Sequence, residues 1–195
     1  VDPTDERIEV VVAVGTDHHP FDRLVGWIDE WAMSRSDVSI LVQRGNSAPT
    51  THCASVDLLP HGDLYQHFAE SMVVVSHGGP STVMDARMVG RLPLVVARDP
   101  DLGEHVDDHQ QRFAQHLARH GLARVTEDRD TLHRWLDEAI EHPDRFAVPF
   151  DAAAVSGVAE FGSKLDELLG TSTPIEPAPA PVEQSRPLSS RAVQA

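Results

Sequence analysis

Short, uniformly apolar runs alternate along the chain with segments in which apolar residues recur at helical spacing. The apolar runs predict strands at residues 8–14, 38–42, 54–59, 72–75, 92–97 and 123–126. The segments between and after them predict helices at 21–33, 61–70, 81–89, 106–120, 130–141 and 151–169. Strands without a polar face are typical of a parallel sheet that is covered by helices on both sides. The pattern therefore predicts an α/β fold.

The composition of the chain changes near residue 170. From Thr171 onward the sequence is rich in Pro, Ala and Ser and has scarcely any aliphatic residues, which is typical of a disordered segment. We therefore expect one domain over residues 1–170 and a disordered tail over 171–195. A chain of 195 residues is long enough for such a domain to bury a core.

The charge of the chain excludes some classes of partner. A net charge of −15 disfavours nucleic acids and anionic membrane surfaces, so any phosphate must be held by local geometry. The single cysteine, Cys53, forbids an internal disulfide and favours a reducing, cytoplasmic compartment. No run approaches the roughly 20 apolar residues of a membrane-spanning helix.

A glycine-rich turn follows the fourth predicted strand, at residues 76–82. Gly78 and Gly79 allow the backbone to approach a diphosphate closely, and the hydroxyl groups of Ser81 and Thr82 can donate to its oxygen atoms. Backbone N–H groups at the start of the next helix supply a positive field. The alternative is an ordinary turn capped by Ser or Thr, since the pattern matches neither the dinucleotide fingerprint nor the P-loop.

Two further loops follow strands at the same predicted edge of the sheet. Gly15 and Thr16 follow the first strand, and the loop from Arg98 to His105 follows the fifth. Ligands of parallel α/β sheets bind in the crevice beyond the carboxyl ends of the strands. The convergence of three loops therefore favours a binding site for a phosphorylated ligand.

Acidic and amide side chains cluster just after the fifth strand. Acids and amides of this kind can hold several sugar hydroxyl groups at once, and both glutamines can donate and accept hydrogen bonds. The alternative is a solvated helix start, where acids complement the helix dipole. The candidate sugar-binding residues are Glu104, His105, Asp108, Gln110 and Gln111.

Asp85 lies one helical turn beyond Thr82, on the same face of the predicted helix. A carboxylate there can bridge the hydroxyl groups of a ribose. The alternative is an acid that complements the dipole of its own helix.

Two patterns resemble metal sites but have simpler explanations. The Asp-Pro-Asp sequence at 99–101 is a common turn former. The pairs His105/His109 and His116/His120 have chelating i,i+4 spacing, but no third ligand stands at a recognised spacing. We therefore expect no metal site.

Four blocks of sequence resemble the C-terminal, donor-binding domain of the family-28 glycosyltransferases. In matching order they are residues 14–16, 20–24, 76–79 and 103–110, and the similarity extends from residue 9 to about 126. It is greatest to the short single-domain members, namely the catalytic subunit of the dolichol-linked GlcNAc transferase and bacterial exopolysaccharide transferase subunits. The chain departs from the family pattern at Pro80 and Ser81, where small residues are usual, and at Asp85, where Glu is usual.

The resemblance implies a Rossmann-like sheet that forms the C-terminal half of a GT-B fold and binds a UDP-sugar. It implies that the diphosphate is bound by Gly78, Gly79, Ser81 and Thr82, the ribose by Asp85, and the sugar by Gln110 and Gln111. Gly15 and Thr16, in the turn at the same edge of the sheet, are further candidates for the diphosphate. Arg98 and the helix that begins near Ser81 would stabilise the charge of the leaving phosphate in place of a metal.

The resemblance further implies transfer of GlcNAc or another hexose to a lipid-linked or polysaccharide acceptor, without a cofactor. The general base of the family lies on the other half of the enzyme. We therefore expect a membrane-associated acceptor-binding partner, or a portion upstream of Val1, and a peripheral position at the inner face of the membrane. The alternatives are a non-catalytic module that binds a nucleotide-sugar and half of a UDP-sugar epimerase.

Overall fold

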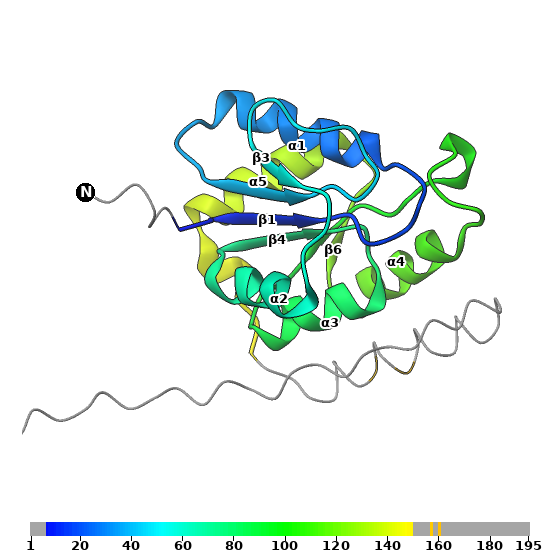
Figure 1. Cartoon of the computed structure of the whole chain (residues 1–195). Helices are drawn as coiled ribbons and strands as arrows, with labels where there is room; N and C mark the ends of the chain where they lie inside the picture. The colour runs from blue at the N-terminus through cyan, green and yellow to red at the C-terminus, as the bar shows by residue number, and fades with distance from the viewer. Residues whose placement is uncertain (1–6, 150–156, 158–159, 161–195) are drawn as a thin grey trace, which may run out of the picture.

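Six parallel strands form one sheet in a computed structural model that describes residues 7–149, 157 and 160 (Figure 1). The strands are β1 (Val10–Ala13), β2 (Ile40–Gln43), β3 (Ala54–Val56), β4 (Val73–Ser76), β5 (Leu94–Val95) and β6 (Arg124–Val125). Their order is β3-β2-β1-β4-β5-β6, and every pairing is parallel. In the register of β1 and β4, Ala13 lies opposite Ser76, so these two strands end at the same level.

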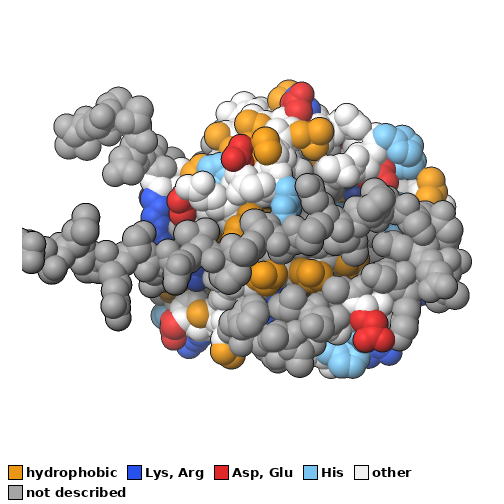
Figure 2. Space-filling view, turned by 60° about the horizontal axis from the view of Figure 1, so that its bottom comes forward, with side chains coloured by type: hydrophobic (Ala, Val, Ile, Leu, Met, Phe, Trp, Pro, Cys, Tyr) orange, Lys and Arg blue, Asp and Glu red, His pale blue; other side chains and the backbone are white. Residues whose placement is uncertain are grey.

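Helices cover both faces of this sheet. The helices among the described residues are α1 (Asp22–Ser34), α2 (His61–Glu70), α3 (Pro80–Met88), α4 (His109–Arg119) and α5 (Arg129–Glu141), with short 3₁₀ turns η1 (Pro100–Leu102) and η2 (Pro143–Phe146). Helices α1 and α5 lie on one face, and α2, α3 and α4 lie on the other (Figure 1). Figure 2 turns the second face forward, and apolar, acidic and histidine side chains are seen together on its visible parts. The predicted α/β fold is confirmed.

The central strands send alternate side chains to the two faces. Val10 and Val12 of β1 pack in the cluster that contains α1 and α5, whereas Val11 and Ala13 pack against α2 and α3. All four side chains are almost completely buried. Because the sheet is covered on both sides, every position of β1 is apolar, which explains the uniform run in the sequence.

The helix predicted at 106–120 begins only at His109. The Asp107 carboxylate accepts a hydrogen bond from the backbone N–H of His109 at 3.1 Å, and this side-chain contact holds the preceding residues in a turn. The predicted helix at 151–169 and the predicted tail at 171–195 lie outside the described residues, apart from residues 157 and 160. Within the part of the chain that is described, no helix combines the length and apolarity needed to cross a membrane.

Candidate functional site

A cleft of about 460 Å³ opens at the carboxyl ends of β1 and β4, beside the start of α4. This is the edge at which ligands bind in parallel α/β sheets. Its lining consists of Thr16, Asp17, His18, His77, Gly78, Gly79, Pro80, Ser81, His109, Gln110 and Phe113. The turn after β4, the loop after β1 and the first residues of α4 therefore meet around one space.

The glycine turn brings the N-terminus of α3 to this cleft. Gly78 has a φ of +87°, and an added Cβ would lie 2.9 Å from Cγ1 of Val95, so only glycine fits the turn. Gly79 is the N-cap, without a side-chain cap, and Pro80 occupies the first helical position. Proline costs nothing there because that N–H has no partner within a helix. The turn thus presents the positive end of a helix to the cleft, which is a site for an anion.

His77 lines the cleft, although the sequence analysis did not include it among the candidate ligand-binding residues. Its ring lies between Gly15 and Gly79, since an added Cβ would meet the ring at 2.7 Å from Gly15 and at 2.5 Å from Gly79. Nδ1 lies 3.2 Å from the carbonyl oxygen of Ala13. Burial, with a contribution from the nearby Arg98 guanidinium, lowers the pKa of His77 to about 4. The imidazole is therefore neutral at pH 7, donates from Nδ1 and keeps Nε2 as an acceptor.

Gln110 provides an unsatisfied amide beside the glycine turn. The residue lines the cleft and is only 8% exposed. Its Oε1 atom has no hydrogen-bond partner among the described residues. A buried carbonyl oxygen without a partner is costly, and a ligand hydroxyl group would satisfy it.

Arg98 is buried beneath the loops and does not line the cleft. Its guanidinium donates to the backbone carbonyl groups of Val14, His19 and Glu104 at 2.8 to 3.0 Å and lies over the ring of Phe21. It therefore ties the loop after β1 to the loop after β5. Its charge reaches the cleft only at a distance, as the lowered pKa of His77 illustrates.

Glu104 is engaged within the protein. Its carboxylate accepts two hydrogen bonds from Arg23, at 2.9 and 2.7 Å, and a third from the N–H of Asp99 at 2.8 Å. Asp108 instead forms a surface ion pair with Arg112. Each carboxylate thus has a protein partner, and neither lines the cleft.

Asp85 points toward α2 instead of the cleft. Its Oδ2 atom lies 2.8 Å from Nε2 of His61, the first residue of α2. Burial raises the pKa of Asp85, and the hydrogen bond from His61 opposes this shift. The carboxylate keeps a second oxygen atom as an acceptor.

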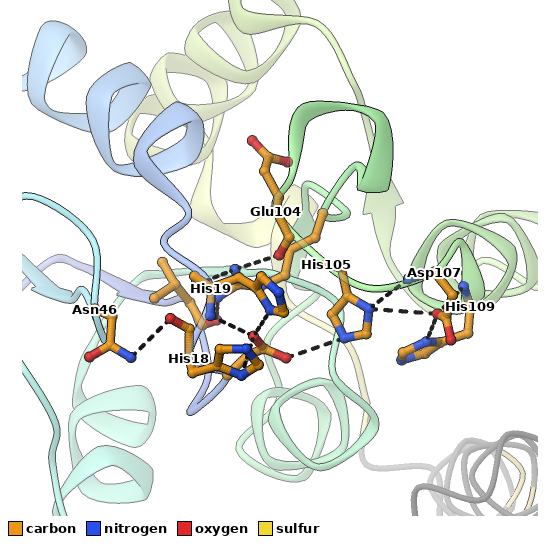
Figure 3. Close-up of polar contacts among 10 residues, drawn as sticks. His18, His19, Asn46, Glu104, His105, Asp107 and His109 are labelled. Atoms are coloured by element: carbon orange, nitrogen blue, oxygen red, sulfur yellow. Dashed lines mark hydrogen bonds and ion pairs between the residues drawn. The ribbon is translucent and has the colours of Figure 1, made fainter.

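The predicted site residues thus divide into two groups. Those that line the cleft are Thr16, Gly78, Gly79, Ser81 and Gln110, and those that do not are Gly15, Thr82, Asp85, Arg98, Glu104, His105, Asp108 and Gln111. His105 turns toward Asp17 (3.3 Å) within a cluster of histidine and acidic side chains at the edge of the cleft (Figure 3). The sequence analysis missed Asp17, His18, His77, His109 and Phe113 as lining residues.

The six-stranded parallel sheet matches the fold of one half of a GT-B protein. The chain belongs to the glycosyltransferase family 28 C-terminal domain, which it matches over residues 9–164. The predicted family is therefore confirmed. Curated protein sequences include no significant match to this chain.

Solved structures with this fold have low sequence identity to the chain. The glycotransferase of kitacinnamycin is 16% identical over 81% of this chain and 40% of its own, with a TM-score of 0.54. MurG of Acinetobacter baumannii is 18% identical over 82% of this chain and 50% of its own, with a TM-score of 0.47. UDP-GlcNAc 2-epimerase of Neisseria meningitidis is 11% identical over 85% of this chain and 44% of its own, with a TM-score of 0.48. The chain thus spans half or less of the length of each of these proteins.

Proposed function

We propose that the cleft binds a UDP-sugar and that the chain supplies the donor-binding half of a hexosyltransferase. The observation that carries this proposal is the unpartnered Oε1 atom of Gln110 beside the glycine turn of α3. The turn suits a diphosphate, and a buried amide oxygen suits a sugar hydroxyl group a few ångströms away. Family membership supports the same assignment.

In the proposed reaction the bond between C1 of the sugar and the β-phosphate oxygen breaks, and C1 bonds to the acceptor oxygen. Negative charge develops on the leaving diphosphate. The N-terminus of α3, behind Gly78 and Gly79, would stabilise this charge, and the buried Arg98 would add a longer-range contribution. Among the residues first assigned to the diphosphate, we propose that Thr16, Gly78, Gly79 and Ser81 contact it, with Gly15 shaping the turn.

The proton of the acceptor hydroxyl group must go to a base. We assign the role of this base to no residue of the cleft. We propose that the base lies with the acceptor site on a second half. That half is a membrane-associated partner protein or another segment of the same polypeptide. Because Asp85 does not line the cleft, we propose that the ribose extends from the cleft toward α2 and contacts the Asp85 oxygen atom that His61 leaves available.

The proposal is tested by isothermal titration of the full chain with UDP, UDP-GlcNAc, UDP-glucose and UDP-galactose. We expect UDP to bind and one UDP-sugar to bind more tightly than UDP. Gln110→Ala should weaken the UDP-sugar about tenfold while leaving UDP affinity nearly unchanged, because only the sugar contact is lost. Gln115→Ala is the matched control, since Gln115 is exposed on the same helix.

Failure of every UDP species to bind contradicts the proposed function. A transfer assay with a co-expressed acceptor-binding protein then separates the alternatives. Sugar transfer supports the transferase, and binding without transfer to any acceptor supports a regulatory module. Conversion of the UDP-sugar to its C2 epimer supports an epimerase.

A further inference from the structure

Two histidines and an aspartate converge where the loop after β5 enters α4 (Figure 3). One ligand atom each from His105, Asp107 and His109 lies within 4.8 Å of the other two. The residues alternate along the chain as His-x-Asp-x-His. We propose that these three side chains form a binding site for a divalent transition-metal ion of the zinc class.

The local backbone holds the three side chains together. His109 is the first residue of α4, and its N–H donates to Oδ1 of Asp107 at 3.1 Å. The N–H of Asp107 lies 3.4 Å from Nδ1 of His105. The Asp107 carboxylate also contacts Nδ1 of His109. Because the turn already orders these groups, little entropy remains to be lost when an ion binds.

The two histidines are also well buried for surface-loop residues. The His105 side chain is 8% exposed and the His109 side chain 14%. Histidine side chains that are free in solvent usually retain several rotamers, whereas these are packed at the edge of the cleft. Packing therefore holds the two histidine side chains in place.

Asp17 orients His105 from the loop after β1. Its Oδ2 atom lies 3.3 Å from Nε2 of His105, so Nε2 carries the proton. Nδ1 then holds the lone pair, which accepts from the N–H of Asp107 at 3.4 Å and which an ion would take over. Asp17 is itself fixed, because the N–H of His19 donates to Oδ1 at 2.7 Å. A carboxylate that holds the second nitrogen of a ligating histidine is the usual support of a metal site.

The ligand types select the class of ion. Two imidazole nitrogens and one carboxylate oxygen suit Zn²⁺, Co²⁺ or Ni²⁺, whereas Mg²⁺ and Ca²⁺ prefer sites made of oxygen. Three protein ligands leave a coordination position open. His109 also lines the cleft, so that position is near the donor diphosphate, a step that rests on the proposed function.

The spacing of these residues explains why the sequence did not predict the site. The sequence analysis looked for a third ligand at a recognised spacing from the i,i+4 pair and found none. Instead, His105 and Asp107 precede the helix, and the turn directs them toward His109.

The test is titration of the chelator-treated full chain with CoCl₂ and then ZnCl₂. We expect one equivalent of Co²⁺ to bind, with the intense visible absorption of a low-coordinate site, and to be displaced by Zn²⁺ but not by Mg²⁺. His105→Gln, Asp107→Asn and His109→Gln should each weaken binding at least tenfold, and Asp17→Asn about 10- to 100-fold through its support of His105. Circular dichroism identifies any variant that fails to fold, and Asp107→Asn makes the smallest change.

The matched control is the double variant His116→Gln with His120→Gln. These two rings are neighbours at the C-terminal end of α4, where His120 is the C-cap, and their centroids lie 4.1 Å apart, so they represent a histidine pair without the turn. Cobalt binding should survive this change. Loss of binding in the control, or binding that survives all three ligand variants, would overturn the site, as would the absence of one-equivalent binding in the unaltered chain.

A second titration separates this site from the proposed function. Metal binding is measured without nucleotide, and UDP binding is then measured with and without Zn²⁺. If the metal binds and UDP does not, the metal site stands and the proposed function fails. If UDP binds equally well with and without Zn²⁺, the proposed link between the ion and the diphosphate is overturned. Tighter UDP binding in the presence of Zn²⁺ supports that link.

Discussion

Arg23 and Glu104 form a doubly hydrogen-bonded ion pair, in which Nε lies 2.9 Å from Oε1 and the nearer Nη atom lies 2.7 Å from Oε2. Arg23 belongs to α1, and Glu104 belongs to the loop between β5 and α4. Arg23 also donates to the carbonyl group of Ala97, two residues after the end of β5. The pair therefore fixes the loop that carries the histidine and aspartate cluster against the first helix of the sheet.

Glu104→Ala should destabilise the protein instead of selectively impairing sugar binding. The Glu104 side chain is 7% exposed and that of Arg23 is 18%, so the substitution leaves a mostly buried guanidinium without its carboxylate. Breaking a buried pair costs about 3 kcal/mol, or roughly 10 °C in melting temperature for a domain of this size. Thermal unfolding by circular dichroism measures the effect.

The exposed pair of Arg129 and Glu30 supplies the control for this experiment. Their side chains are 45% and 48% exposed, and Glu30→Ala should leave the melting temperature nearly unchanged. If Glu104→Ala unfolds at the temperature of the unaltered chain but loses its preference for a UDP-sugar over UDP, Glu104 is a sugar ligand after all.

The fold was predictable because the central strands are buried on both sides. Every residue of β1 and β4 is buried, so the apolar runs identify the strands without knowledge of their neighbours. The start of α4 was not predictable from periodicity. The Asp107 carboxylate accepts from the N–H of His109 and holds the preceding residues in a turn, so the helix begins only at His109. Local spacing predicts elements, whereas side-chain contacts determine where some of them begin.

The lining of the cleft was predictable in part, at the glycine turn and at Gln110. Gly78 and Gly79 lie where a side chain would collide with a neighbour, and Gly78 also has a positive φ. A glycine pair after a predicted strand indicates such a tight turn in the sequence. A charged loop residue has the same appearance in a sequence whether it faces a ligand or a distant side chain. Arg98 and Glu104 have protein partners, and Arg23 is 81 residues away from Glu104. Their burial is decided by tertiary packing, which no local pattern records.

Gly79→Ala should weaken UDP binding at least tenfold by displacing His77. Gly79 has an ordinary φ of −63°, so the added methyl group causes no backbone strain, but it would lie 2.5 Å from Nε2 of His77. The ring must move away from Ala13, at a cost of about 1–3 kcal/mol in stability. Titration calorimetry with UDP and thermal unfolding measure the two effects.

Two variants test this explanation of the glycine requirement. Gly26→Ala, at an exposed position of α1 with open space around it, should increase stability by about 1 kcal/mol. Combining Gly79→Ala with His77→Ala should recover part of the lost stability, because the methyl group then has room. Strictly additive losses in the double variant would show that the two residues do not collide.

His77 should make the protein less stable as the pH falls from about 6.5 to about 4. The pKa of an ordinary histidine is 6.5, and burial lowers that of His77 to about 4. In this interval the unfolded chain binds a proton that the folded protein does not, so stability falls with pH and the loss is complete below the folded pKa. The total effect is at most about 3 kcal/mol. Urea unfolding across this pH range measures it, and the His77→Gln variant should have a flatter profile. Parallel profiles would contradict the assignment.

Asp85→Asn should abolish discrimination between UDP and 2′-deoxy-UDP. If Asp85 accepts a hydrogen bond from the ribose, the unaltered chain binds UDP about tenfold more tightly than the deoxy analogue, since a bond to a charged acceptor is lost. Asparagine retains the size of the side chain and can still accept from His61, which lies 2.8 Å away, so the fold should persist. Asp63→Asn, an exposed acid on α2, is the control and should keep the discrimination. Calorimetric titration of both ligands into the three proteins measures the ratios. Equal affinities for the two ligands in the unaltered chain would mean that the carboxylate serves only to join α3 to α2 through His61.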